Sequence, residues 1–259
     1  MAIVIRSSRE IAKVKESGMI VGEVLSKMKN TARLGMSTAE LNEIAEQVLK
    51  DTGSVGLFKG VDGGPGVRPF PAVTCISINE QVVHGIPSPK RLLAEGDIVS
   101  VDFGVKRGGY CGDAATTFGI GRVSSDKQHL MDVTRKVLDI AVEMIRPGIR
   151  WSRIAAKMQQ AAESAGCSVV RDLVGHGIGT ELHADPQVPN YAGWGSNMSD
   201  FTLKQGMIIA VEPMITLGGY KIRTLNDGWT VVTADGSPAA HYEHTIAVVK
   251  DGCEVLTLN

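Results

Sequence analysis

The sequence predicts an α+β fold built from two related halves, each with a pair of helices followed by antiparallel strands. Two observations lead to this prediction. The same order of helical and strand-like patterns occurs twice along the 259-residue chain, and several motifs recur in that order. No linker-like composition separates the halves, so we expect one domain over residues 1–259, with a pseudo-twofold axis and a site between the halves.

The first half opens with two helical patterns. Ser7 and Glu10 have the spacing of a capping box, in which the two side chains satisfy free backbone N–H groups at the helix start. Ser37 and Glu40 repeat that spacing before a second helical pattern, and Gly53 provides its C-terminal stop. Short runs rich in Val, Ile, Thr and Phe then predict strands.

The second half repeats this order. Ser125 and Gln128 have capping-box spacing before a third helical pattern, which Pro147 ends. A fourth helical pattern ends near Gly166. Strand-like runs fill the remainder, with a long loop expected around residues 186–200.

Matching motifs indicate a true duplication. His84-Gly85-Ile86 recurs as His176-Gly177-Ile178, and the strand that ends in Val-Asp102 recurs as one that ends in Val-Glu212. Each half therefore keeps an imidazole and carboxylates at equivalent positions. A duplicated hydrophobic core alone would not need these polar residues.

Composition and charge exclude several functional classes. The chain has 27 Lys and Arg against 28 Asp and Glu, so it lacks the basic field that holds nucleic acid or an anionic membrane surface. No apolar run approaches the roughly 18 residues of a membrane span, and the start does not resemble a secretory signal. The cysteines show no metal-binding spacing, which favours reduced thiols in a cytoplasmic protein. They are Cys75, Cys111, Cys167 and Cys253.

Two aspartates share one predicted hairpin. A two-residue turn at Arg107-Gly108 would place Asp102 directly opposite Asp113, with Cβ atoms about 5 Å apart. Such a pair can be solvated on an open face, can share one proton, or can bind a metal ion. The apolar residues around Asp102 argue against an open face.

The second half adds further metal-ligand types. Glu212 and Glu243 interrupt apolar strands, and His176 lies between two glycines that leave its ring room. With the two aspartates they give four carboxylates and one imidazole, whose charge two divalent ions would neutralise. Such ligands suit Mn, Fe(II), Co or Zn, and hydrolases use two-metal sites of this kind.

Two other histidines are candidates for substrate contact. His84 belongs to the duplicated motif and lies in a predicted loop, and His183 closely follows His176. The remaining histidines have no such support and are interpreted as structural. They are His129, His241 and His244.

These motifs resemble the type I methionine aminopeptidases, a family of the pita-bread metallopeptidases. The resemblance runs from the first helix to the C-terminus. The matching stretches include Cys75–Pro87, Gly96–Asp102, Gly112-Asp113, Gly175–Gly179, Glu212–Met214, Asp227–Thr230 and Tyr242–Ile246. The resemblance implies a pita-bread fold and a catalytic domain that removes initiator methionine when the second residue is small. Peptides and nascent chains would be its partners, with transient ribosome contact and a monomeric state.

The resemblance also implies the metal ligands. Asp102 would hold one of two ions with both oxygens, while Asp113 and Glu243 would bridge both ions. His176 and Glu212 would complete the other site. A water made acidic by the two ions would attack the first peptide bond.

The remaining roles follow from the same resemblance. Glu212 would accept and shuttle the proton of the water, His183 would polarise the scissile group, and His84 would stabilise the substrate amide. The matching methionine-pocket residues are Cys75, Phe70 and Trp229. The segment Val61–Pro71 and Leu182 differ from the usual family pattern.

Two rival functions remain to be separated. An Xaa-Pro peptidase of the same superfamily usually has a large additional N-terminal domain, for which this chain has no room. A catalytically inactive pita-bread module that binds peptides typically lacks metal ligands, whereas all five candidate ligands are present here.

Overall fold

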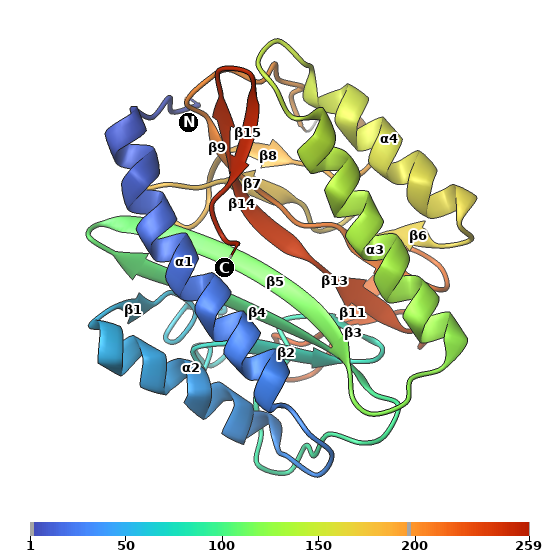
Figure 1. Ribbon diagram of the computed structural model, residues 1–259. Coiled ribbons are helices and arrows are strands. Elements are labelled where there is room, and N and C mark those ends of the chain that lie inside the picture. The colour runs from blue at the N-terminus through green and yellow to red at the C-terminus, as the bar shows by residue number, and fades with distance from the viewer. Residues whose placement is uncertain (1–2, 196–197, 259) are drawn as a thin grey trace.

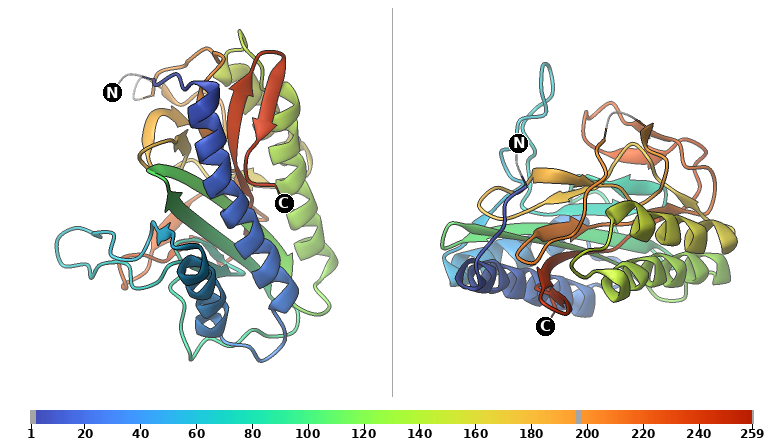
Figure 2. Two further views of the ribbon diagram at one scale, coloured as in Figure 1. Left: turned by 60° about the vertical axis from the view of Figure 1, so that its left-hand side comes forward. Right: turned by 90° about the horizontal axis from the view of Figure 1, so that it is seen from above.

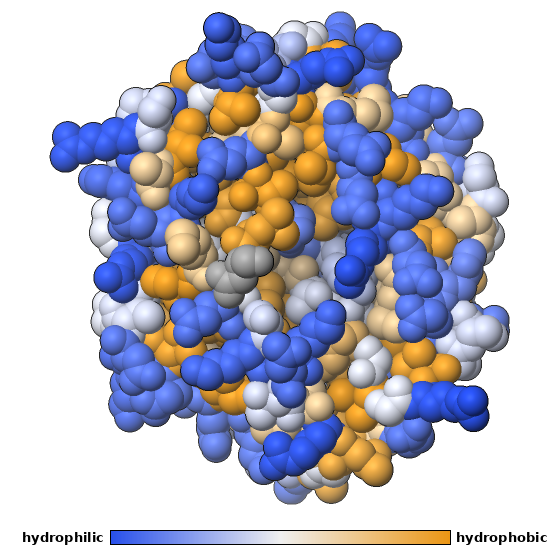
Figure 3. Space-filling model, viewed as in Figure 1, coloured by the Kyte–Doolittle hydropathy of each residue, from blue (hydrophilic) through white to orange (hydrophobic). Residues whose placement is uncertain are grey.

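The computed structural model describes residues 3–195 and 198–258. Its fold confirms the predicted α+β class, with helix pairs along one side of curled antiparallel sheets (Figures 1 and 2). The described residues form the helices α1 (Ser8–Thr31), α2 (Thr38–Thr52), α3 (Ser125–Met144) and α4 (Trp151–Ser164). On this helix side, hydrophilic side chains are widespread and apolar ones gather between them (Figure 3).

The predicted helix boundaries are largely confirmed. Ser7 and Ser37 form the expected capping boxes, and Gly53 ends α2 in the left-handed conformation with a φ of 62°. For α3 the predicted start is wrong by one residue. Ser124 is the N-cap, and its side chain accepts a hydrogen bond from the Lys127 N–H. An N-cap side chain satisfies a backbone N–H two or three residues later, which would otherwise be free.

One large sheet crosses both halves of the molecule. Its order is β1-β4-β5-β14-β9-β7-β8, with β2 paired to β4 and β15 paired to β14. Its strands within the described chain are β1 (Val55–Gly56), β2 (Cys75–Ile78), β4 (Ile98–Arg107), β5 (Tyr110–Gly119), β7 (Gly175–Gly177), β8 (Ala184–Val188), β9 (Ile208–Val211), β14 (Glu243–Val249) and β15 (Gly252–Val255).

Two small sheets flank the large one. One contains β13 (Ala239–His241), β10 (Met214–Thr216) and β6 (Ser168–Val169), and the other contains β11 (Ile222–Thr224), β12 (Val231–Thr233) and β3 (Gln81–Val83). The predicted long loop around residues 186–200 therefore begins later than expected, because β8 continues to Val188.

Each helix pair covers its own hydrophobic core on one face of the sheet. The first core packs α1 and α2 against alternate residues of β4, among them Val101 and Phe103. The second packs α3 and α4 against alternate residues of β9 and β14, among them Ile209 and Ile246. Side chains alternate along a strand, so Asp102 must point to the opposite face, away from the helices.

The register of the β4–β5 hairpin differs from the prediction. Asp102 lies opposite Ala115, and Asp113 lies opposite Gly104. The turn is Gly108-Gly109, with φ values of 55° and 84°, rather than Arg107-Gly108. A two-residue turn of this kind needs positive φ at both central residues, which two glycines adopt most readily. The shift of two residues keeps both aspartates on the same face.

All four cysteines are free thiols. None of the helices in the described residues is long and apolar enough to cross a membrane.

Candidate metal centre

Five neighbouring strands each supply one candidate ligand. Across the sheet order β4-β5-β14-β9-β7 these are Asp102, Asp113, Glu243, Glu212 directly after the last residue of β9, and His176. The two halves meet between β5 and β14, where Glu243 lies opposite Ala115. Residues distant in the sequence therefore converge on one face of one sheet.

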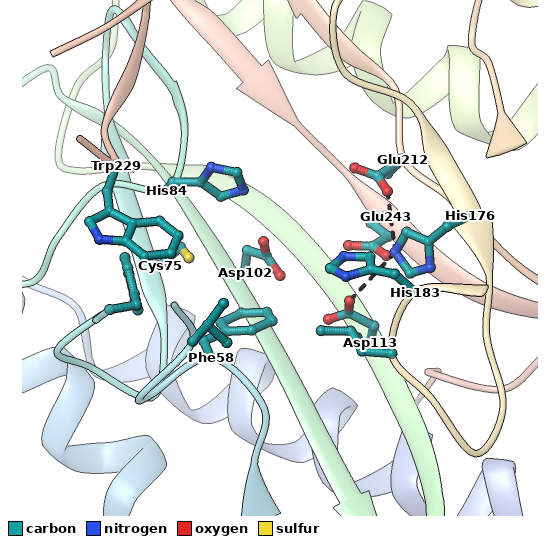
Figure 4. A pocket seen from close by; sticks show the side chains of 13 residues that line it. Phe58, Cys75, His84, Asp102, Asp113, His176, His183, Glu212, Trp229 and Glu243 are labelled. Carbon is teal, nitrogen blue, oxygen red and sulfur yellow. Dashed lines mark ion pairs between the residues drawn. The ribbon is translucent and has the colours of Figure 1, made fainter. Parts of the chain in front are cut away.

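The side chains approach closely enough to share metal ions. Asp113, His176 and Glu243 offer ligand atoms that all lie within 4.8 Å of one another. His176 Nε2 lies 3.6 Å from Glu212 Oε1 and 4.0 Å from Asp113 Oδ2. Asp102 lies beside this cluster and lines the same cavity (Figure 4).

Several of these oxygens lack the partners that buried polar atoms require. In the described part of the chain, Asp102 Oδ1, Asp113 Oδ1 and Glu243 Oε1 are buried without a hydrogen-bond partner. Buried acceptors are almost always satisfied, so such a group of orphaned carboxylate oxygens needs an explanation. Divalent cations would satisfy them, and an oxygen-rich set with one imidazole fits such ions.

Electrostatics support the same interpretation. Burial raises the pKa of Asp102, Glu212 and Glu243 well above that of a free carboxyl, and the nearby Asp113 raises each further. Burial also raises the pKa of Asp113 itself, to about 7. Burial lowers the pKa of His176 to about 4, so its ring is neutral and able to coordinate a metal at neutral pH.

The raised carboxyl pKa values predict how the metal-free protein responds to pH. A carboxyl whose pKa is higher in the folded than in the unfolded state destabilises the fold at high pH and not at low pH. For Asp113 this loss develops between the ordinary value of 3.8 and about 7. The melting temperature of the metal-free protein should therefore fall as the pH rises through this window. Added divalent metal should abolish this dependence on pH. Calorimetric melts at several pH values test this, and a metal-free stability that rises across the window would contradict it.

The two predicted substrate histidines lie at the same cavity. His84 follows β3 in the left-handed region, with a φ of 59°, and the His183 ring lies 4.5 Å from the His176 ring, centroid to centroid. Figure 4 shows the His84 and His183 rings pointing toward each other across the space beside Asp102. Burial lowers the pKa of His84, with a smaller effect of His183, and burial lowers the pKa of His183.

One histidine interpreted as structural lies at the site instead. His241 is 2% exposed, and its Nε2 lies 3.8 Å from Glu212 Oε2. No single alternating pattern indicates this position, because β13 ends at His241 and β14 begins at Glu243. The other two lie elsewhere: His244 Nδ1 contacts Thr257 Oγ1 at 2.8 Å, and His129 Nε2 contacts the Ala165 carbonyl at 2.9 Å.

One cavity of about 170 Å³ has the carboxylates at one end and apolar side chains at the other, and this apolar end is here called the apolar cavity. The predicted pocket residues Cys75, Phe70 and Trp229 line it, and Cys75 lies opposite Asp102 in the β2–β4 register. Phe58 and Val61 also line it and were not predicted. Their position depends on a long-range closure, since the Gly60 N–H donates to the Phe70 carbonyl, and no local pattern indicates that contact.

Comparisons with known proteins point to one group. Residues 12–250 match metallopeptidase family M24. A methionine aminopeptidase of Clostridium acetobutylicum is 46% identical over 99% of this chain and 99% of its own. The crystal structure of a methionine aminopeptidase from Thermotoga maritima covers both chains fully with a TM-score of 0.93 and 40% identity. A prolidase from Pyrococcus furiosus shares only the fold, with a TM-score of 0.76 and 19% identity. The structural match covers 99% of this chain and 66% of that protein.

Proposed function

The chain belongs to metallopeptidase family M24, and on that premise we propose that it is a methionine aminopeptidase that releases N-terminal methionine from peptides and nascent proteins. The observation that carries this proposal is the apolar cavity opening directly onto the buried carboxylate cluster. The cavity suits an unbranched apolar first side chain, and the cluster suits metal-assisted hydrolysis of the adjacent peptide bond.

The ligand set would hold two divalent ions. In this proposal Asp102 would hold one ion, His176 and Glu212 would hold the other, and Asp113 and Glu243, whose strands lie between, would serve both. When bound, the two ions supply an acidified water and a polarised carbonyl. Mn, Fe(II), Co and Zn all fit these ligands.

The other residues position and protonate the reacting groups. Glu212 accepts the proton of the attacking water and delivers it to the leaving amine. His183 and His84 line the cavity as neutral rings, each with one donor nitrogen, so His183 donates to the scissile carbonyl and His84 contacts the substrate amide. Donors fixed in a site that excludes water stabilise developing charge without reorganisation.

The substrate path has two compartments. A second cavity of about 420 Å³ shares His84 and His183 with the first and is also lined by Met214 and His241. We place the methionine side chain in the apolar cavity and the rest of the peptide in this second one. This proposal treats residues 1–259 as one catalytic domain, acting as a cytoplasmic monomer on chains with a small second residue during transient ribosome contact.

A peptide assay tests the proposal. Metal-stripped protein is incubated with a Met-Gly peptide and a matched Ala-Pro peptide, with Mn, Fe(II) or Co added, and the released residue is detected. We expect metal-dependent release of methionine alone. Release from the Ala-Pro peptide alone would assign the chain to the prolyl branch, and no release with any metal would favour a binding module.

A further inference from the structure

A loop of residues 61–69, here called the rim loop, stands on the edge of the apolar cavity. Its neck is closed, because the Gly60 N–H donates to the Phe70 carbonyl at 2.8 Å and the Phe70 N–H donates to the Val61 carbonyl at 2.9 Å. Figure 2 shows this part of the chain projecting far from the body of the molecule, on the side of the sheet away from the helices.

The rim loop is packed against one cavity wall. Its Arg68 carbonyl accepts a 2.8 Å hydrogen bond from the indole Nε1–H of Trp229. Val67 lies against Gly228, where an added Cβ would come within 2.6 Å of Val67 Cγ1. A Cβ on Gly63 would lie 2.9 Å from the indole Cζ2 of Trp229 and 2.4 Å from Val67 Cγ1. Val67 is therefore tightly packed against Gly63 and Gly228, and Gly63 in turn lies against the indole.

Trp229 is held from its other sides as well. Asp227 Oδ1 accepts a hydrogen bond from the Trp229 N–H at 2.8 Å, which fixes the backbone. Inside the cavity, the Phe70 ring packs edge-on against the indole with centroids 5.2 Å apart. Figure 4 shows the indole nitrogen on the side away from the metal ligands. The rim loop thus supports the outer edge of the indole, while the rest of the ring borders the cavity.

We propose that the rim loop determines which first side chain the cavity accepts, because Val67 and the Arg68 carbonyl position Trp229 and so set the width of the cavity. This inference rests on the proposed function. Val67 does not line the cavity itself, so it acts as a positioning residue. Its contacts leave the carboxylate cluster untouched, which separates an effect on selectivity from an effect on the chemistry.

The test is the substitution Val67→Ala, which removes two methyl groups that pack against Gly63 and Gly228, the glycines next to Trp229 in space and in sequence. We measure kcat/KM for peptides that begin with Met, norleucine, Leu or Phe and continue identically. The preference for Met over Leu and Phe should fall by about tenfold, since one methylene of pocket space changes discrimination by roughly 10–200-fold. The ratio of Met to norleucine, which is equally long and unbranched, should stay the same.

Three further variants make the test specific. Pro65→Ala alters an exposed residue of the same loop and should leave all ratios unchanged. Val67→Thr keeps the shape of the side chain and should retain the wild-type preference. Gly63→Ala adds a methyl group behind the indole and should raise the preference for Met over Phe, so it supplies an independent test if Val67→Ala folds poorly.

The outcomes separate the two proposals. If the wild-type protein releases no methionine with any metal, the proposed function fails. If the wild-type protein is active but Val67→Ala and Gly63→Ala both keep its Met-to-Leu and Met-to-Phe ratios within twofold, the rim loop does not set selectivity. A purely structural role for Val67 would lower the rates for all substrates equally and leave the ratios unchanged, which also overturns the inference.

Discussion

Replacement of Asp102 by asparagine is expected to lower methionine release by about a hundredfold or more, because even the loss of a residue that only supports a metal ligand typically costs 10–100-fold. The amide has nearly the same shape as the carboxylate but lacks the charge and the second acceptor oxygen. Asp102 is partly buried on β4, and its Oδ1 atom is buried with no hydrogen-bond partner in the described part of the chain. Its main role in this account is therefore toward metal.

The same substitution should not harm the metal-free fold. Burial raises the pKa of Asp102, and the nearby Asp113 and Glu212 raise it further, so the carboxylate is unfavourable without a cation. Metal-free Asp102→Asn should melt at or above the temperature of the metal-free wild type, and it should bind less metal. Asp139→Asn, at an exposed position on α3, is the matched control. Wild-type turnover and wild-type metal content in Asp102→Asn would contradict the assignment of Asp102 as a ligand.

Substitution of His84 should produce a different defect. His84→Ala is expected to keep the full metal content and to lower kcat by about 10²–10³, the range seen when one donor to a developing charge is removed. The ring lies in the same cavity as the ligands but follows β3, outside the five ligand-bearing strands. Mass spectrometry of the intact protein gives the metal content, and steady-state kinetics give kcat and KM.

The backbone at His84 calls for a second variant. Its φ of 59° is a conformation that alanine adopts poorly but asparagine tolerates. His84→Asn should therefore keep the local structure and still lose most of kcat, with a smaller loss than His84→Ala because the amide can donate a hydrogen bond. A sharp fall in metal content in His84→Asn would mean that His84 is a ligand.

Much of the fold was predictable because its signals are local. The capping boxes at Ser7 and Ser37 involve residues three positions apart, and both form as expected. Acids such as Asp102 and Glu212 stand out because they interrupt apolar strands, where a carboxylate needs a reason to be buried. The duplicated motif that contains His84 and His176 gave the remaining signal.

The errors came from geometry that sequence spacing constrains weakly. The hairpin register was predicted two residues off, although the preference of Gly108-Gly109 for positive φ could have decided it. His241 was missed because β13 and β14 are separate strands that break at Tyr242, so no single alternating pattern joins it to the ligands. Phe58 lines the cavity next to the neck of the rim loop, where the Gly60 N–H donates to the Phe70 carbonyl. No local sequence pattern predicts that hydrogen bond.

Anomalous diffraction from crystals grown with Mn is the most direct test of the central claim that five neighbouring strands build a two-metal site. We expect two anomalous peaks roughly 3.5–4 Å apart. One should lie against Asp102 and the other against His176 and Glu212, with Asp113 and Glu243 touching both. A single peak at full occupancy, or peaks that make no contact with Asp113 and Glu243, would contradict it.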